Sequence, residues 1–226
     1  MASVNPVPVI TLDGPSGSGK GTISRRLATA LGWHYLDSGA LYRLLACAAE
    51  RDGIALDDAP ALAALAARTH GEFRLSSPAG ECVLLDGVDV TTRLRTEACG
   101  RVASLIAALP AVRAALLDWQ RAYRTAPGLV ADGRDMGTVV FPDAALKIFL
   151  TATPEERARR RYKQLKDNNN TVLLEEIVRE IRERDQRDRS RRTAPLVPAD
   201  DAVLLDNSEM DIDATLARVL EMAASI

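Results

Sequence analysis

The stretch Gly14-Pro-Ser-Gly-Ser-Gly19-Lys20-Gly21-Thr22 decides the fold of this 226-residue chain. It matches the pattern G-x-x-x-x-G-K, in which glycines let successive backbone N–H groups turn inward around an anion. The apolar residues 7–12 precede it as a buried strand would, and residues 20–31 follow with helical spacing that stops at Gly32. A strand, a glycine-rich turn and a helix in this order predict a phosphate-binding loop, with Lys20 reaching the phosphates.

The rest of the chain continues the alternation of strands and helices. Further strands are expected over residues 33–36, 129–131, 146–150 and 202–205. Helices are expected over residues 39–51, 96–109, 111–124, 155–166, 172–192 and 211–224. About five core strands that alternate with helices predict an α/β fold with a parallel sheet flanked by helices.

The pattern changes between residues 70 and 95. Short apolar runs are separated there by the turn signals Ser76-Ser-Pro-Ala-Gly and Asp86-Gly87. Such turns indicate a small antiparallel sheet inserted in the α/β core.

Composition excludes several classes of protein. The chain is 47% hydrophobic and 27% charged, so disorder is not its main state. Its 29 basic and 31 acidic residues nearly cancel, which argues against general binding to nucleic acid or to a membrane surface. We find no signal peptide and no apolar run long enough to span a membrane, and expect a cytoplasmic protein. Cys47, Cys82 and Cys99 are odd in number and lack CxxC spacing, so neither a disulfide framework nor a zinc site is expected.

Two polar segments follow predicted strands. Residues 37–43 (DSGALYR) follow the second strand, and residues 132–137 (DGRDMG) follow the strand at 129–131. Loops at the carboxyl ends of parallel strands hold ligands in α/β proteins, so both are candidate site segments. Asp132 ends a buried strand, where a carboxylate can organise Mg²⁺. Two alternatives stay open: Ser38 caps the following helix, and residues 132–137 form a salt-bridged turn.

The predicted helix at 172–192 changes character along one face. Its apolar stripe comprises Leu174, Ile177, Val178 and Ile181. The same spacing continues into Arg184, Asp185, Asp188 and Arg191. Buried charges need partners, and a phosphorylated ligand would supply them. The alternative is an ion-pair ladder on a solvated helix end.

Four segments together resemble the bacterial cytidylate kinases, a family of nucleoside monophosphate kinases. They are GPSGSGKGT, LDSGALYR, ADGRDMGTVVFPDA and RDQRDRSRRTAPL, in this order and spacing. The form Gly-Lys-Gly-Thr, with a hydroxyl at Thr22 rather than directly after Lys20, is typical of nucleoside monophosphate kinases. The resemblance extends over essentially the whole chain, including the insertion. It implies a P-loop core (residues 1–38 and 126–226), a monophosphate-binding lobe (39–125) and a short helical lid (about 156–170).

The resemblance also implies an activity and a set of site residues. The activity is transfer of the ATP γ-phosphoryl group to CMP or dCMP, with Mg²⁺ as cofactor, by a monomer. The implied catalytic residues are Lys20, Arg134 and Arg184. The implied ATP-binding residues are Gly14, Pro15, Ser16, Gly17, Ser18, Gly19, Lys20, Gly21, Thr22 and Arg160. The implied CMP-binding residues are Ser38, Arg43, Ser104, Arg113, Arg134, Asp135, Arg184, Asp188 and Arg191. Thr22 and Asp132 are candidates to hold the metal through water, and Arg157, Arg160 and Arg161 are candidate lid arginines.

Two other functions stay open at this point. One is a small-molecule kinase that phosphorylates a hydroxyl, such as shikimate kinase, with Asp37 or Asp135 as a base. The other is a nucleotide-binding switch, although we find neither a guanine-reading N/T-K-x-D motif nor a water-positioning Gln after a suitable strand.

Overall fold

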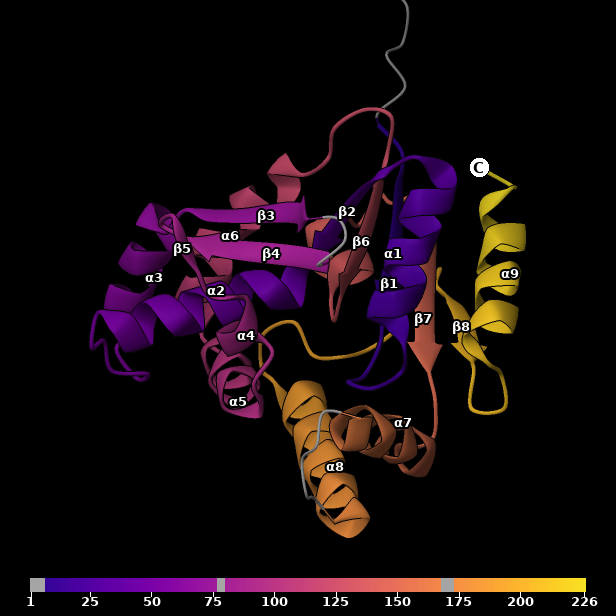
Figure 1. Ribbon diagram of the computed structural model, residues 1–226. Coiled ribbons are helices and arrows are strands. Elements are labelled where there is room, and N and C mark those ends of the chain that lie inside the picture. Colours follow the sequence, from indigo (N-terminus) through magenta and orange to yellow (C-terminus); the bar gives the residue numbers. More distant parts are fainter. Residues whose placement is uncertain (1–6, 77–79, 168–172) are drawn as a thin grey trace, which may run out of the picture. The chain divides into compact units, whose positions relative to one another are not determined.

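The computed structural model describes residues 7–76, 80–167 and 173–226, which form two compact units (Figure 1). One unit comprises residues 1–36 and 121–226, and the other comprises residues 37–120. The predicted boundaries, after residues 38 and 125, lie a few residues away from these. That the two units act as P-loop core and monophosphate lobe stays a prediction.

The first unit is built on a five-stranded sheet with the strand order β2-β6-β1-β7-β8. Its strands are β1 (Val9–Asp13), β2 (His34–Asp37), β6 (Leu129–Gly133), β7 (Leu146–Thr151) and β8 (Val203–Asp206). All five residues of β1 and of β6 are buried, because a central parallel strand is covered on both faces. β1 pairs in parallel with β6 and with β7, and β7 pairs in parallel with β8. The predicted α/β fold with about five parallel strands is confirmed.

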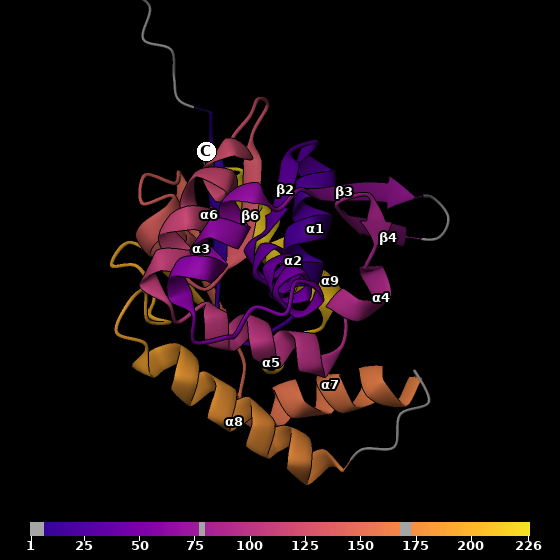
Figure 2. The same cartoon turned by 90° about the vertical axis from the view of Figure 1, so that its left-hand side faces the viewer.

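Helices of the first unit cover this sheet or follow it. They are α1 (Lys20–Leu31), α7 (Pro154–Asp167), α8 (Leu174–Ser190) and α9 (Ile212–Ala223). Apolar side chains of α1 and α9 pack with those of the sheet in one core that includes Ile10, Leu27, Leu150 and Val219. Both Figures 1 and 2 show α7 lying beside α8, where Ala158, Ile177 and Ile181 form a small core of their own.

The second unit contains the antiparallel insertion and most of the remaining helices. Its elements are α2 (Ser38–Arg51), α3 (Ala59–Arg68), β3 (Gly71–Ser76), β4 (Gly80–Leu85), β5 (Val88–Asp89), α4 (Thr91–Leu94), α5 (Glu97–Ile106) and α6 (Pro110–Ala122). The strands pair antiparallel in the order β3-β4-β5, as the turn signals predict. Asp37, and not Ser38, caps α2 by accepting a hydrogen bond from Ala40 N at 3.0 Å. The interpretation of Ser38 as a helix cap is therefore wrong.

No single helix in the described part of the chain is both long and apolar enough to cross a membrane. The helices α5 and α6 would satisfy that test only together, and the chain bends by 104° between them.

Candidate active site

The loop between β1 and α1 takes a shape that only glycine permits. Gly14, Gly17 and Gly19 have φ angles of 153°, 80° and 89°, which L-amino acids rarely adopt. A Cβ on Gly14 would also lie 2.0 Å from the Leu150 carbonyl oxygen, so no side chain fits there. Gly19 caps α1, and its carbonyl oxygen accepts the first backbone bond of the helix from Thr22 N. The N-terminus of α1, which favours an anion, therefore opens directly at this loop.

Two carbonyl groups of the loop accept hydrogen bonds from side chains that lie more than 140 residues later in the sequence. Ser16 O accepts a hydrogen bond from Arg157 Nη1 at 3.0 Å. Ser18 O accepts one from Asn207 Nδ2 at 3.0 Å and another from Arg160 Nη1 at 3.3 Å. These three hydrogen bonds fix the carbonyl groups of Ser16 and Ser18 and so hold the course of the loop. Arg160, expected among the ATP-binding residues, thus lies at the phosphate loop.

Lys20 and Asp132 lie at the start of α1. Lys20 is 9% exposed, and its Nζ donates to Pro15 O at 3.2 Å, so the ammonium group lies over the loop. A Cβ on Gly21 would lie 3.1 Å from Asp132 Oδ2, which shows how closely this carboxylate approaches the loop. Tyr35 donates its hydroxyl to the same oxygen at 3.4 Å. A side chain at Gly21 would therefore require Asp132 to shift by a few tenths of an ångström.

Asp132 and Thr22 carry oxygen groups of the kind that bind a magnesium ion together with nucleotide phosphates. Mg²⁺ prefers oxygen ligands, keeps several waters, and usually takes only one or two carboxylates from the protein. Asp132 supplies a carboxylate that is 5% exposed, and Thr22 supplies a half-buried hydroxyl one residue beyond Gly21. The donor set therefore suits this ion.

A turn after β6 is fixed by Asp13, a residue that the sequence analysis does not single out. Asp13 ends β1 and accepts hydrogen bonds from Met136 N and Gly137 N, both at 2.8 Å. The chain there forms a π-helical turn, Met136–Val140, that begins after the buried Asp135. Burial raises the pKa of Asp13 to about 7, against the two backbone hydrogen bonds, which lower it. Asp13 thus orients the segment that carries Arg134 and Asp135.

Arg134 and three residues of α8 and its C-cap form an ionic cluster. Arg134 Nε donates to Asp188 Oδ2 at 3.0 Å, and Arg191 Nη2 lies 3.7 Å from Asp188 Oδ1. Burial acts to raise the pKa of Asp188, but the charges of Arg134, Arg191 and Arg184 prevail and lower it. Asp188 is 4% exposed, whereas Arg184 is half-buried. Three guanidinium groups around one carboxylate leave a surplus of positive charge, as a phosphate site requires.

The predicted stripe on α8 is buried in part, because Val178, Arg184 and Arg191 are only half-buried. Ile177, Ile181, Asp185 and Asp188 are buried along one face, whereas Leu174 is 39% exposed. The apolar side of the helix therefore does turn ionic in its second half, and the solvated ion-pair ladder is wrong for Asp185 and Asp188.

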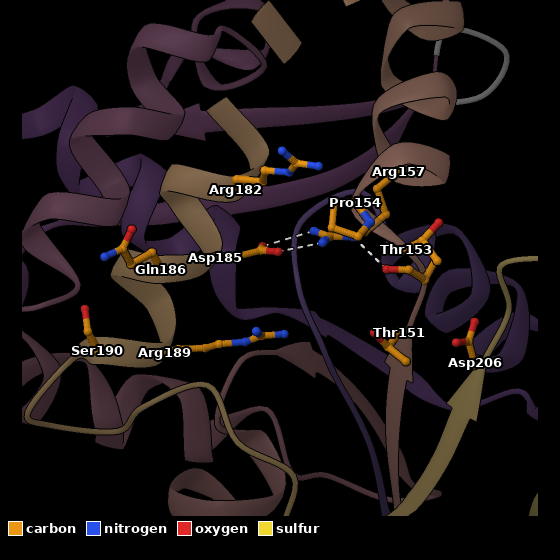
Figure 3. Close-up of a pocket in the computed structure, with 11 residues that line it drawn as sticks. Thr151, Thr153, Pro154, Arg157, Arg182, Asp185, Gln186, Arg189, Ser190 and Asp206 are labelled. Atoms are coloured by element: carbon orange, nitrogen blue, oxygen red, sulfur yellow. Dashed lines mark hydrogen bonds and ion pairs between the residues drawn. The ribbon is translucent and has the colours of Figure 1, made fainter. Parts of the chain in front are cut away.

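Arg157 differs from the lid arginine that the sequence suggests. It is 2% exposed, and its guanidinium binds both carboxylate oxygens of Asp185 as well as the carbonyl oxygens of Ser16 and Ala152. Figure 3 shows this ion pair among the side chains that line a pocket. The pocket has a volume of about 740 Å³. Arg161 instead donates to Gln164 on the surface of α7. The end of the predicted lid, residues 168–170, lies outside the described residues.

In the second unit, two of the predicted acceptor-side residues are held by hydrogen bonds. Ser38 Oγ donates to Gln120 Oε1 at 2.8 Å. Arg43 donates through Nη1 to the carbonyl oxygens of Leu94 and Thr96, which precede α5. The first contact joins α2 to α6, and the second joins α2 to the residues just before α5.

Ser104 and Arg113 are the other two predicted acceptor-side residues of the second unit. Ser104 Oγ on α5 is buried and has no hydrogen-bond partner within the described residues. Arg113 is 8% exposed, donates to Ala107 O at 3.1 Å, and lies 5.8 Å from the centre of the Tyr42 ring. A buried hydroxyl without a partner is costly unless a ligand completes it.

The predicted site residues therefore fall into two sets. Within the first unit the structure brings together Lys20, Asp132 and Arg160 around the phosphate loop, and separately Arg134, Arg184, Asp188 and Arg191. Within the second unit it holds Ser38, Arg43, Ser104 and Arg113. That both sets face one acceptor nucleotide stays a prediction.

Comparison with known proteins separates the functions left open by the sequence. The sequence model of the cytidylate kinase family matches residues 10–225. The chain belongs to the cytidylate kinase family. It is therefore an enzyme, a kinase that phosphorylates a nucleoside monophosphate. This membership removes the hydroxyl-directed kinase and the nucleotide-binding switch.

Curated cytidylate kinases match over nearly their full length. The cytidylate kinase of Stutzerimonas stutzeri (strain A1501) is 57% identical over 222 residues, covering 98% of this chain and 97% of its own. That of Pseudomonas aeruginosa (strain UCBPP-PA14) is 58% identical, with 95% and 94% covered, and that of Aeromonas salmonicida (strain A449) is 56% identical, with 96% and 94% covered. Among solved structures, a shikimate kinase from Acinetobacter baumannii covers 97% of this chain and 94% of its own at a TM-score of 0.45 and 17% identity, too distant a similarity to bear on function.

Proposed function

We propose that this cytidylate kinase transfers the γ-phosphoryl group of ATP to CMP or dCMP and releases ADP with CDP or dCDP. The observation that carries the proposal is the full-length similarity, at 56–58% identity, to enzymes named cytidylate kinase. The phosphate loop, the ionic cluster at Asp188 and the buried hydroxyl of Ser104 supply groups that such a reaction needs.

The donor nucleotide would bind at the loop between β1 and α1. Residues 14–22 present glycine-rich backbone to the phosphates, and Lys20 and Arg160 supply positive charge beside it. Asp132 and Thr22 would hold Mg²⁺ through water. When bound, this ion would neutralise charge on the phosphate oxygens.

The acceptor would be held by charge and by hydrogen bonds to its base. Arg43, Arg134 and Arg184 would bind the phosphate of CMP, and Asp188 its ribose. Ser38, Ser104, Arg113, Asp135 and Arg191 would face cytosine. Arginine suits the phosphate because its planar fork can bind two phosphate oxygens at once.

The reaction needs no general base, because the attacking phosphate oxygen of CMP is already ionised. That oxygen forms a bond to the γ-phosphorus of ATP, while the bond from this phosphorus to the β–γ bridging oxygen breaks and leaves ADP. Catalysis then consists of holding the two phosphates in line and offsetting their charge. Asp13, the carboxyl with a raised pKa, binds two backbone N–H groups and has a positioning role in this scheme.

The decisive test is release of ADP from ATP and Mg²⁺ with CMP, dCMP, UMP, AMP and shikimate as alternative acceptors. We expect fast turnover with CMP and dCMP. Turnover with one of the other acceptors, and with neither CMP nor dCMP, would overturn the proposed acceptor. Slow ATP hydrolysis that no acceptor accelerates would overturn the proposed transfer.

A pair of variants tests the acceptor side separately. Ser104→Ala removes the buried hydroxyl on α5, and we expect it to raise KM for CMP at least tenfold with KM for ATP unchanged, a cost of about 1.4 kcal/mol. Ser24→Ala is the matched control, because Ser24 Oγ on α1 is also buried and has no hydrogen-bond partner in the described residues. Equal effects of both variants on KM for CMP would remove Ser104 from the site.

A further inference from the structure

Two cysteines that are far apart in the sequence meet in the second unit. Cys47 on α2 and Cys99 on α5 are both buried, with their Sγ atoms 3.7 Å apart. A disulfide needs about 2.0 Å between the sulfurs, so a closure of about 1.7 Å would join them. The reaction proposed above uses neither thiol.

Both cysteines line a small cavity. Its volume is about 250 Å³, and the rest of its lining includes apolar side chains such as Leu56 and Val102. Arg93 and Glu50, which form an ion pair with each other, also line it. A hydroperoxide is small enough to enter such a space.

The surroundings of Cys99 favour its thiolate. Cys99 lies in the first turn of α5, where its backbone N–H is capped by Thr96 Oγ1 and the helix dipole stabilises a negative charge. The hydrogen bond that Cys99 shares with Cys47, joined by the charges of Arg43 and Arg93, lowers the pKa of Cys99, against the effect of burial. The same contact raises the pKa of Cys47, and burial adds to this effect. One thiol is thus prepared to attack and its neighbour to resolve.

We propose that Cys47 and Cys99 form a reversible disulfide when a hydroperoxide enters this cavity. The Cys99 thiolate attacks the peroxide O–O bond, which yields Cys99 sulfenic acid and, after protonation, one water or alcohol. The Cys47 sulfur then attacks the Cys99 sulfur, and its proton leaves with the hydroxyl group as water. The two thiols together lose two electrons and two protons, and the peroxide is reduced.

The disulfide would act on a residue of the proposed acceptor site. Arg43 lies one helical turn before Cys47 on α2, and its backbone oxygen lies 3.5 Å from Cys99 Sγ, which donates to it while Cys99 is a protonated thiol. A Cβ on Gly100 would lie 2.7 Å from Arg43 Nη2, so α5 packs directly on this guanidinium. Drawing α2 and α5 together would therefore move Arg43. This consequence rests on the proposed function, whereas formation of the disulfide does not.

The test treats the folded Cys82→Ser enzyme, which keeps only the two thiols in question, with hydrogen peroxide. We expect peptide mapping without reduction to show Cys47 linked to Cys99, with two hydrogen atoms lost and both thiols restored by a dithiol reductant. KM for CMP should rise at least threefold in the oxidised enzyme and return on reduction. Oxygen added to Cys99 without a cross-link, or a cross-link that forms only in denaturant, would overturn the proposal.

A second variant separates the pair from a single reactive thiol. In Cys47→Ala with Cys82→Ser, Cys99 has no resolving partner and should accumulate sulfenic or sulfinic acid. An intact disulfide with unchanged KM would contradict only the effect on Arg43. Absence of turnover before oxidation would contradict the proposed function while leaving the peptide map decisive.

Discussion

The guanidinium of Arg157 and the carboxylate of Asp185 form a two-pronged ion pair that is buried between α7 and α8. The same guanidinium donates to Ser16 O of the phosphate loop at 3.0 Å. Because a buried charge without its partner is costly, Asp185 determines whether Arg157 can stay at this loop. The pair thus connects the helix that carries Asp188 to the loop proposed to bind ATP.

Replacing Asp185 by asparagine should be costly for this reason. We expect Asp185→Asn to lower the free energy of unfolding by about 3 kcal/mol, because the amide cannot neutralise Arg157. KM for ATP should rise as well, since Arg157 no longer fixes Ser16 O. Urea unfolding and steady-state kinetics measure both effects. Glu183→Gln, an exposed position on the same helix, is the control, and an equal loss of stability there would contradict the account.

Arg184 provides a test of the ionic cluster. Its charge helps to lower the pKa of Asp188, and its half-buried side chain adds positive charge to the ionic cluster, where an anion would be stabilised. We expect Arg184→Ala to reduce turnover at least tenfold, or by more than about 1.4 kcal/mol of transition-state stabilisation. Arg187→Ala removes an exposed arginine from the same helix and should leave turnover unchanged. Wild-type turnover in Arg184→Ala would exclude this residue from the site.

A comparison of Gly14 with Gly32 distinguishes the cost of backbone strain from the cost of a steric clash, because both have a positive φ. Gly14 has a φ of 153° and Gly32 a φ of 65°, but a Cβ on Gly32 would meet no atom within 4 Å, whereas one on Gly14 would meet Leu150 O. Gly32→Ala should therefore cost about 1 kcal/mol of stability. Gly14→Ala should cost at least about 3 kcal/mol, or prevent folding. Similar midpoints of thermal unfolding for the two variants would show that the loop can move away from β7.

The stability of the protein should depend on the ionisation of Asp13. Its pKa of about 7 in the folded protein exceeds the ordinary value of 3.8, so the folded state holds a proton that the unfolded state has lost between these values. The contribution of this group to the free energy of unfolding is therefore greatest below pH 4 and decreases as pH rises toward 7.

The variant Asp13→Asn isolates this contribution, since it removes the titration and keeps the size of the side chain. The difference in free energy of unfolding between the wild type and Asp13→Asn, measured by urea unfolding from pH 5 to pH 8, should shift against the wild type as pH rises. A difference that is constant across this range would mean that burial does not raise the pKa of Asp13.

Elements defined by local signals could be predicted closely from the sequence. The helix α1 has the expected bounds, Lys20–Leu31, because glycines in the left-handed conformation stand at both of its ends. The buried strands follow from continuous apolar runs, and Val9–Asp13 lies within a few residues of the prediction. The π-helical turn Met136–Val140 could not be predicted, because Asp13, more than a hundred residues earlier, accepts the hydrogen bonds that fix it.

The same distinction applies to the candidate site. Lys20 and Asp132 could be predicted as site residues, because Lys20 follows a glycine-rich turn and Asp132 follows an apolar strand. Asn207 could not, since its role depends on Ser18 O, 189 positions away, and no local pattern marks it. Arg157 lies on the helix that the sequence predicts for the lid, but its burial could not be predicted. The burial depends on Asp185 of the next helix.

The contacts of the phosphate loop also bear on how the protein is made. β1 is the central strand between β6 and β7, Gly14 lies against Leu150, and Ser18 O depends on Asn207. Each of these partners is synthesised long after the loop has left the ribosome. The loop therefore acquires its binding shape only after Asn207 has been synthesised, and we expect ATP not to assist the folding steps that come before.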